Sequence, residues 1–164
     1  MPKATVDTCS LPVTDYLALA REKGIVLALV RTSDREACGS GDLPDGCDVM
    51  RIPEPGVWGD GKWDGFGYWC GPEDEECLEE VLGIIGKGSF PPRGSRGKLS
   101  PGQRRQMRDA MIFTSHVRHG HDVFVTEDLK GFISNGRREL LQDRFSTRIM
   151  TTVEFVEFLR GGMQ

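Results

Sequence analysis

Apolar and polar positions along the chain form alternating blocks that predict strands and helices in turn. Residues 25–30 are a continuous aliphatic run, as expected of a strand buried on both faces of a parallel sheet. Further strands are predicted over residues 3–7, 121–126 and 148–150, and helices over residues 11–23, 73–85, 100–120 and 137–142 and from 151–152 onward. This order favours an α/β fold, a three-layer α/β/α arrangement with a mainly parallel central sheet.

Glycine and proline are concentrated in one part of the chain. The 164 residues are a length typical of one domain. Residues 39–102 hold 15 of the 21 glycines and 7 of the 9 prolines. We therefore predict a single domain over residues 1–164, with a glycine- and proline-rich insertion at about residues 38–100.

Neither export nor membrane insertion is predicted. The longest apolar run, residues 25–30, is far too short to span a bilayer, and the N-terminus lacks the apolar core of a signal peptide. The five cysteines are an odd number, which fits reduced thiols in the cytosol. We expect a cytoplasmic protein with no membrane partner.

Charge is distributed unevenly, although the net charge is only −4. Residues 1–82 carry 7 basic and 17 acidic side chains, whereas residues 83–164 carry 14 and 8. Residues 93–108 include six basic side chains and no acidic one, and Arg105 and Arg108 belong to this run. Such a patch can bind phosphates whatever the net charge, although charge alone favours the simpler interpretation of a solvated loop and helix face.

Carboxylates follow the predicted strands at the edge where parallel sheets bind ligands. Asp7, Asp34 and Asp128 each come at or just past the end of a strand, and Asp109 lies in the helix before the third strand. Carboxylates gathered at one edge ionise together only with a cation between them, and oxygen ligands favour Mg²⁺ or Mn²⁺. Each aspartate can instead be a helix cap or a turn residue.

The second acidic position is open between two residues. Asp34 comes just past its strand, whereas Ser33 and Glu36 match the spacing of a helix capping box, which gives Glu36 a structural role. Among supporting residues, His116 follows Asp109 by seven positions and shares its helix face. His116 is therefore a candidate for contact with phosphate or with a metal-bound water, or for a supporting surface role.

Three segments carry a resemblance to a known family. In residues 109–132 an Asp opens a helix of alternating apolar positions, and the following strand ends in Thr-x-Asp with a Phe beyond it. Residues 149–155 (Ile-Met-Thr-Thr-Val-Glu-Phe) and residues 6–11 (Val-Asp-Thr-Cys-Ser-Leu) are similar to the family's closing and opening motifs. Over residues 3–36 and about 103–160 the chain resembles the PIN-domain ribonucleases.

The resemblance implies roles for particular residues. Asp7, Asp109 and Asp128 correspond to family acids that hold Mg²⁺ or Mn²⁺, and Thr126 to the hydroxyl at the strand end. Cys9 stands where the family usually has Asn. The insertion lies outside the family's usual core.

On this resemblance we expect a metal-dependent endoribonuclease that hydrolyses RNA phosphodiester bonds. Its catalytic carboxylates would be Asp7, Asp34, Asp109 and Asp128. Many similar small proteins are toxins held by an antitoxin, so an antitoxin partner and a homodimer are both considered. The alternative is a catalytically inactive PIN-like module that binds RNA or protein.

Overall fold

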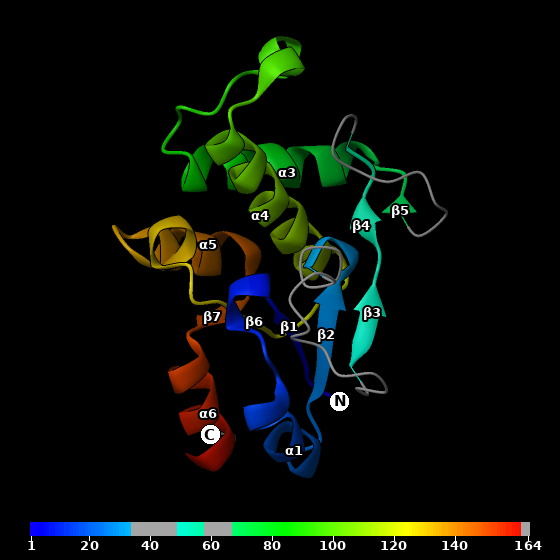
Figure 1. The fold of residues 1–164 in the computed structure, drawn as a ribbon, viewed down its shortest axis with the longest axis vertical. Helices are drawn as coiled ribbons and strands as arrows, with labels where there is room; N and C mark the ends of the chain where they lie inside the picture. Colours follow the sequence, from blue (N-terminus) through cyan, green and yellow to red (C-terminus); the bar gives the residue numbers. More distant parts are fainter. Residues whose placement is uncertain (34–48, 58–66, 162–164) are drawn as a thin grey trace.

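A parallel sheet forms the centre of the computed structural model, which describes residues 1–33, 49–57 and 67–161. Within these residues the sheet has five strands in the order β3-β2-β1-β6-β7, all parallel (Figure 1). They are β1 (Lys3–Val6), β2 (Val26–Val30), β3 (Met50–Ile52), β6 (Val123–Val125) and β7 (Arg148–Met150). A separate pair consists of β4 (Glu54–Pro55) and β5 (Gly67–Tyr68).

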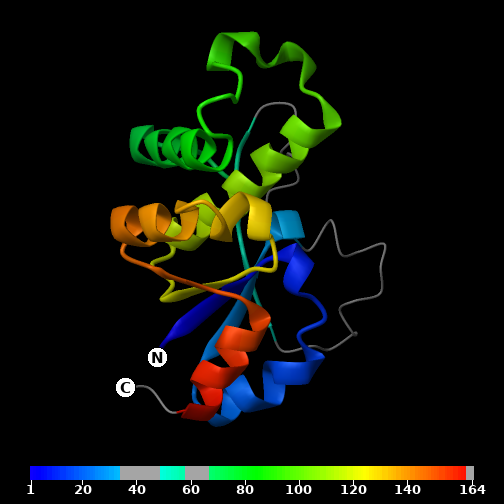
Figure 2. The same ribbon diagram turned by 90° about the vertical axis from the view of Figure 1, so that its left-hand side faces the viewer.

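Helices cover both faces of the sheet, as Figure 2 shows from the side. One face packs against α1 (Thr14–Glu22) and α6 (Thr152–Gly161). The other face packs against α3 (Pro72–Ile85), α4 (Pro101–Arg118) and α5 (Arg137–Phe145). Short helical turns are η1 (Thr8–Ser10), η2 (Arg93–Lys98) and the π-helical η3 (Leu129–Ile133). The predicted α/β class with helices on both sides of a parallel sheet is confirmed.

The aliphatic run of β2 is explained by its place between the two helical layers. Successive side chains of a strand point to opposite faces. Ala28 and Val30 belong to the core beneath α4, whereas Leu27 and Leu29 belong to the core beneath α1 and α6. Both faces exclude water, so no polar position interrupts the strand.

Two helix boundaries illustrate local control by the sequence. The helix predicted from residue 11 begins only at Thr14, because Leu11 precedes Pro12 and such a residue is confined to extended backbone. The start of α4 is confirmed at its predicted position. Ser100 Oγ accepts a hydrogen bond from Gln103 N (3.2 Å), and Pro101 occupies the first helical position, where no N–H is needed.

The glycine-rich stretch contributes to the core of the domain. Its strand β3 pairs with β2, with Ile52 opposite Val30. Its helix α3 buries one aliphatic side against α4 and α5, formed by Leu78, Val81, Leu82 and Ile85. Residues 39–102 are therefore joined to the sheet by an edge strand and to the helical layer by a buried helix.

Phe113 of α4 lies at the centre of the larger core and is fully buried. Its ring centre lies 5.1 Å from that of Phe124, 5.6 Å from that of Phe132 and 5.6 Å from that of Phe145. We expect Phe113→Ala to lower the free energy of unfolding by about 3–5 kcal/mol, because it removes these contacts and leaves a cavity. Urea denaturation measures this, and the exposed Val153→Ala serves as a control that should change stability by less than about 0.5 kcal/mol.

Candidate functional site

Asp7 lies at the carboxyl end of the central strand β1 and is almost fully buried, with 3% of its surface exposed. Its backbone N–H donates to the carbonyl of Val125 at the end of β6. Its Oδ1 accepts a hydrogen bond from Thr8 N (2.7 Å), and the carboxylate caps η1. The carboxylate is therefore held in one orientation between the ends of two neighbouring strands.

Thr126 connects Asp7 with Asp128. The Thr126 hydroxyl donates to Asp7 Oδ2 (2.7 Å) and accepts from Asp128 N (3.1 Å). Oδ1 of Asp128 accepts from Lys130 N (3.1 Å) and Gly131 N (2.9 Å), so this carboxylate caps η3. The structure brings three sequence-predicted site residues together at the carboxyl edge of the sheet.

Cys9 contacts the same carboxylate. Its thiol donates to Asp7 Oδ2 (3.2 Å), and its sulfur accepts from Glu127 N (3.2 Å). Burial, with the nearby charge of Asp7, raises the pKa of the Cys9 thiol to about 12. The thiol therefore stays protonated at neutral pH and acts as a hydrogen-bond donor rather than a nucleophile.

Glu54 is a buried acid that the sequence analysis did not single out. It follows β3, is 1% exposed, and accepts a hydrogen bond from Thr32 Oγ1 (2.6 Å) just past β2. Ile52 pairs with Val30, so Glu54 and Thr32 each lie two residues beyond a paired position at the carboxyl edge. In the sequence, β3 is indicated only by the short, mostly apolar run at residues 49–52 (Val-Met-Arg-Ile), which lies in a segment rich in glycine and proline.

Asp109 lies half-buried in α4, and the basic residues Arg105 and Arg108 precede it on the same helix. Because α4 leads by a short turn into β6, its N-terminal half lies toward the carboxyl edge of the sheet. The two candidates for the second acid, Asp34 and Glu36, lie outside the described residues.

The described side chains include oxygen donors but do not form a metal site. Carboxylate oxygens suit a hard cation such as Mg²⁺. Across residues 1–33, 49–57 and 67–161, however, no three acidic, histidine or cysteine side chains converge to hold an ion. Asp7 and Asp128 flank Thr126 but bind it and the adjacent backbone. The described donors fit a divalent ion in chemistry but do not form a complete ligand set.

His116 is a core residue, which corrects the expectation that it contacts phosphate or a metal-bound water. It is fully buried, and Thr5 Oγ1 and Thr147 Oγ1 lie 2.9 Å and 2.6 Å from its Nδ1 and Nε2. The Thr5 hydroxyl also lies 2.8 Å from Nδ1 of His121. The Thr147 hydroxyl donates to the carbonyl of Asp122 (3.4 Å), which selects one proton arrangement with both rings neutral: His121 donates to Thr5, Thr5 to His116, and His116 to Thr147.

Comparison with known proteins adds no family assignment. The chain matches no model of a known protein family, and no curated protein matches it significantly. In the part of the chain that the structure describes, no helix is long and apolar enough to cross a membrane.

Removing the Thr126 hydroxyl tests whether its hydrogen bonds to Asp7 and Asp128 stabilise the fold. We expect Thr126→Val, which keeps the side-chain shape, to lower the free energy of unfolding by about 1.5–3 kcal/mol, because a buried carboxylate loses a donor. Urea denaturation at pH 7.5 measures this. The exposed Thr14→Val is the matched control, and an equal loss in both variants would contradict the assigned role.

The buried histidines predict acid destabilisation. Burial lowers the pKa of His116 from 6.5 to about 3 and that of His121 to about 4, so only the unfolded chain takes up these protons as pH falls below 6.5. The free energy of unfolding should therefore be greatest above pH 6.5. Toward pH 5 it should fall by up to about 1.4 kcal/mol per pH unit for each histidine.

Urea denaturation at several pH values between 7.5 and 5 measures this slope. In His121→Gln it should be about half that of the wild type, since one of the two groups no longer titrates. A slope unchanged by the substitution would show that other groups cause the acid sensitivity.

Proposed function

We propose that this chain is a metal-dependent endoribonuclease of the PIN type. Its substrate would be RNA, and Asp7, Asp109 and Asp128 would hold Mg²⁺ or Mn²⁺ with a further acid. Asp34 and Glu36 are the acids considered from the sequence, and the buried Glu54 is an additional one. Such an ion supplies positive charge at the scissile phosphate and lowers the pKa of a bound water.

The observation that carries the proposal is the pairing of Asp7 and Asp128 through Thr126 at the carboxyl edge of the parallel sheet. Ligand sites of open parallel sheets gather at this edge, where side chains from separate strands meet. Burial of a carboxylate such as Asp7 costs free energy unless it is well paired, and such positions are frequent at functional sites.

The position of Asp109 on α4 also supports the proposal. Asp109 and His116 share one helix face, seven residues apart, and His116 packs against Thr5 of β1. Seven residues correspond to about 10 Å along a helix. The face that packs on β1 at His116 therefore carries Asp109 toward the carboxyl edge, where Asp7 ends the same strand.

The alternative function is that of a PIN-like module that binds RNA or protein without cleaving it. The internal hydrogen bonds of the two carboxylates favour this alternative. Asp7 caps η1 and Asp128 caps η3, which are structural roles that require no ion. An antitoxin, a homodimer and a cytoplasmic location remain parts of the proposal under either function.

Incubating the purified chain with labelled single-stranded RNA separates the two functions. We expect cleavage in Mg²⁺ or Mn²⁺, none in EDTA, and at least a 100-fold lower rate in Asp109→Asn, because that change removes a charged ligand at constant shape. Product formation on denaturing gels measures the rate.

Asp143→Asn, an exposed aspartate of α5, is the control and should cleave at the wild-type rate. Intact RNA with every divalent ion, together with retained RNA binding, would favour the non-catalytic module. Equal rates in Asp109→Asn and Asp143→Asn would remove Asp109 from the site.

A further inference from the structure

A cavity of about 630 Å³ lies between α3, η2 and the N-terminal half of α4. Its apolar wall is formed by Val57, Leu78, Leu99 and Met107. Three arginines, Arg93, Arg96 and Arg104, and one acid, Glu75, also line the cavity. The volume lies in the range of small-molecule sites and exceeds that of one nucleobase.

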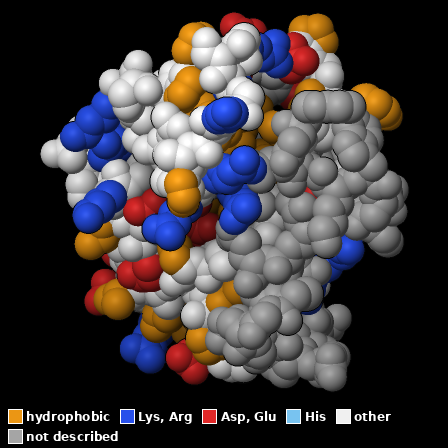
Figure 3. All heavy atoms as spheres, turned by 45° about the horizontal axis from the view of Figure 1, so that its top comes forward, with side chains coloured by type: hydrophobic (Ala, Val, Ile, Leu, Met, Phe, Trp, Pro, Cys, Tyr) orange, Lys and Arg blue, Asp and Glu red, His pale blue; other side chains and the backbone are white. Residues whose placement is uncertain are grey.

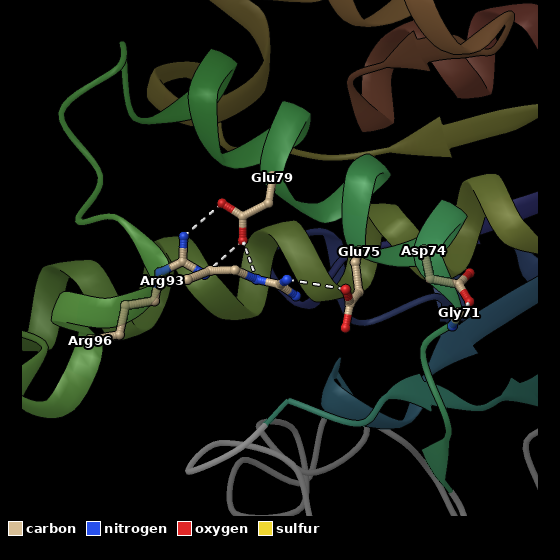
Figure 4. A network of polar contacts seen from close by, with 6 residues as sticks. All are labelled: Gly71, Asp74, Glu75, Glu79, Arg93 and Arg96. Atoms are coloured by element: carbon tan, nitrogen blue, oxygen red, sulfur yellow. Dashed lines mark hydrogen bonds and ion pairs between the residues drawn. The ribbon is translucent and has the colours of Figure 1, made fainter.

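An ion-pair network holds the η2 side of the cavity against α3, as Figure 4 shows. Nη1 and Nη2 of Arg96 donate to Oε1 and Oε2 of Glu79, at 2.8 Å and 2.7 Å. Arg93 pairs with Glu75 (3.1 Å) and with Glu79 (3.4 Å). The hydrogen bond from Arg96 lowers the pKa of Glu79, which keeps this carboxylate ionised. Arg93 and Arg96 therefore hold η2 against α3, and this contact fixes one side of the cavity.

Arg104 differs from these two arginines. Arg104 is exposed, and its guanidinium group has neither a hydrogen-bond nor an ion-pair partner among the described residues. It lines the cavity from α4, one helical turn before Met107. Its charge is thus available to a ligand at the mouth of an apolar site.

Basic side chains on α4 connect the acidic edge with this cavity. Asp109 neighbours Arg105, Arg105 neighbours Arg108, and Arg108 neighbours Arg104, because each pair is three or four residues apart. Arg104 in turn neighbours Met107 in the cavity. These adjacent side chains therefore form a continuous path around the helix, from the side that carries Asp109 to the side that lines the cavity. Figure 3, with the η2 end turned forward, shows Lys and Arg side chains gathered on this face.

We propose that the cavity between α3, η2 and α4 binds one nucleotide of a single-stranded RNA whose phosphates follow the arginines of α4 from the acidic edge. The apolar wall accepts an unstacked base, and Arg104 contacts a phosphate. A base in a duplex stays stacked and cannot enter. This inference rests on the proposed function for its ligand, and it assigns substrate selection to the glycine-rich part of the chain.

Two glycines of η2 provide a matched test. Gly97 lines the cavity and Gly94 does not, and an added Cβ at either position meets no atom within 4 Å. Neither has the left-handed backbone that disfavours a side chain. Gly97→Leu should fill the cavity and weaken binding of a fluorescent single-stranded 8-mer RNA about tenfold, whereas Gly94→Leu should bind like the wild type.

Fluorescence anisotropy in EDTA measures binding without cleavage. Arg104→Gln should weaken binding and reduce the slope of log K against log salt by about 0.7, the value for one phosphate contact on a single strand. Arg160→Gln, an exposed arginine of α6, is the charge-matched control and should leave both unchanged. A duplex of the same sequence should bind more weakly than the single strand.

The outcomes separate this inference from the proposed function. In one outcome the wild type binds RNA without cleaving it, and Gly97→Leu weakens that binding. The cavity is then a nucleotide site and the nuclease proposal fails. If the wild type cleaves RNA but Gly97→Leu and Gly94→Leu bind equally, the cavity is not a nucleotide site and the nuclease proposal stands. Equal affinity for duplex and single strand, or no RNA binding at all, would also overturn the inference.

Discussion

Strand β1 lies in the middle of a sheet that is covered on both faces, and this placement requires every polar side chain on it to find a partner inside the protein. Thr5 meets the requirement through His116 and His121, which connects β1 to α4 and to the segment before β6. Asp7 meets it through Thr8, Cys9 and Thr126. One buried strand thereby positions a neutral histidine pair in the core and a carboxylate at the edge of the sheet.

The same requirement explains why the candidate site is built from hydrogen bonds between chain segments far apart in the sequence. The Thr126 hydroxyl has one proton and can accept as well as donate, so it serves Asp7 and the backbone of Asp128 together. This link joins the ends of the two central strands. A carboxylate oriented in this way is suited to hold a cation, and it is equally suited to cap a helical turn. Geometry alone is compatible with both, because each needs fixed oxygen atoms at the same edge.

The glycine-rich stretch has two distinct physical roles. Its aliphatic residues on α3 are buried in the main core, and β3 adds an edge strand to the sheet. Two of its arginines, Arg93 and Arg96, pair within the stretch with Glu75 and Glu79, whereas Arg104 of α4 is exposed beside a cavity. Net charge conceals this arrangement, since Glu75 and Glu79 of α3 compensate the arginines of η2, and Asp74 of α3 pairs with Arg118 near the C-terminal end of α4. The positive charge at the N-terminal half of α4 is therefore a local property of one surface.

Local sequence determined most of the architecture. Side-chain chemistry and chain order explain the buried strand at residues 25–30 and the start of α4 at Ser100–Pro101. They also explain why Asp7 and Asp128 lie at strand ends.

Tertiary structure decided which neighbours each side chain contacts. His116 has the spacing of a site residue, but its helix face packs on β1, so it is buried against Thr5 and Thr147. Glu54 follows a strand of three residues in a glycine-rich segment, and only pairing of that strand with β2 brings it to the edge beside Thr32. Periodicity specifies which residues share a face, whereas the partner of that face depends on contacts between segments distant in the chain.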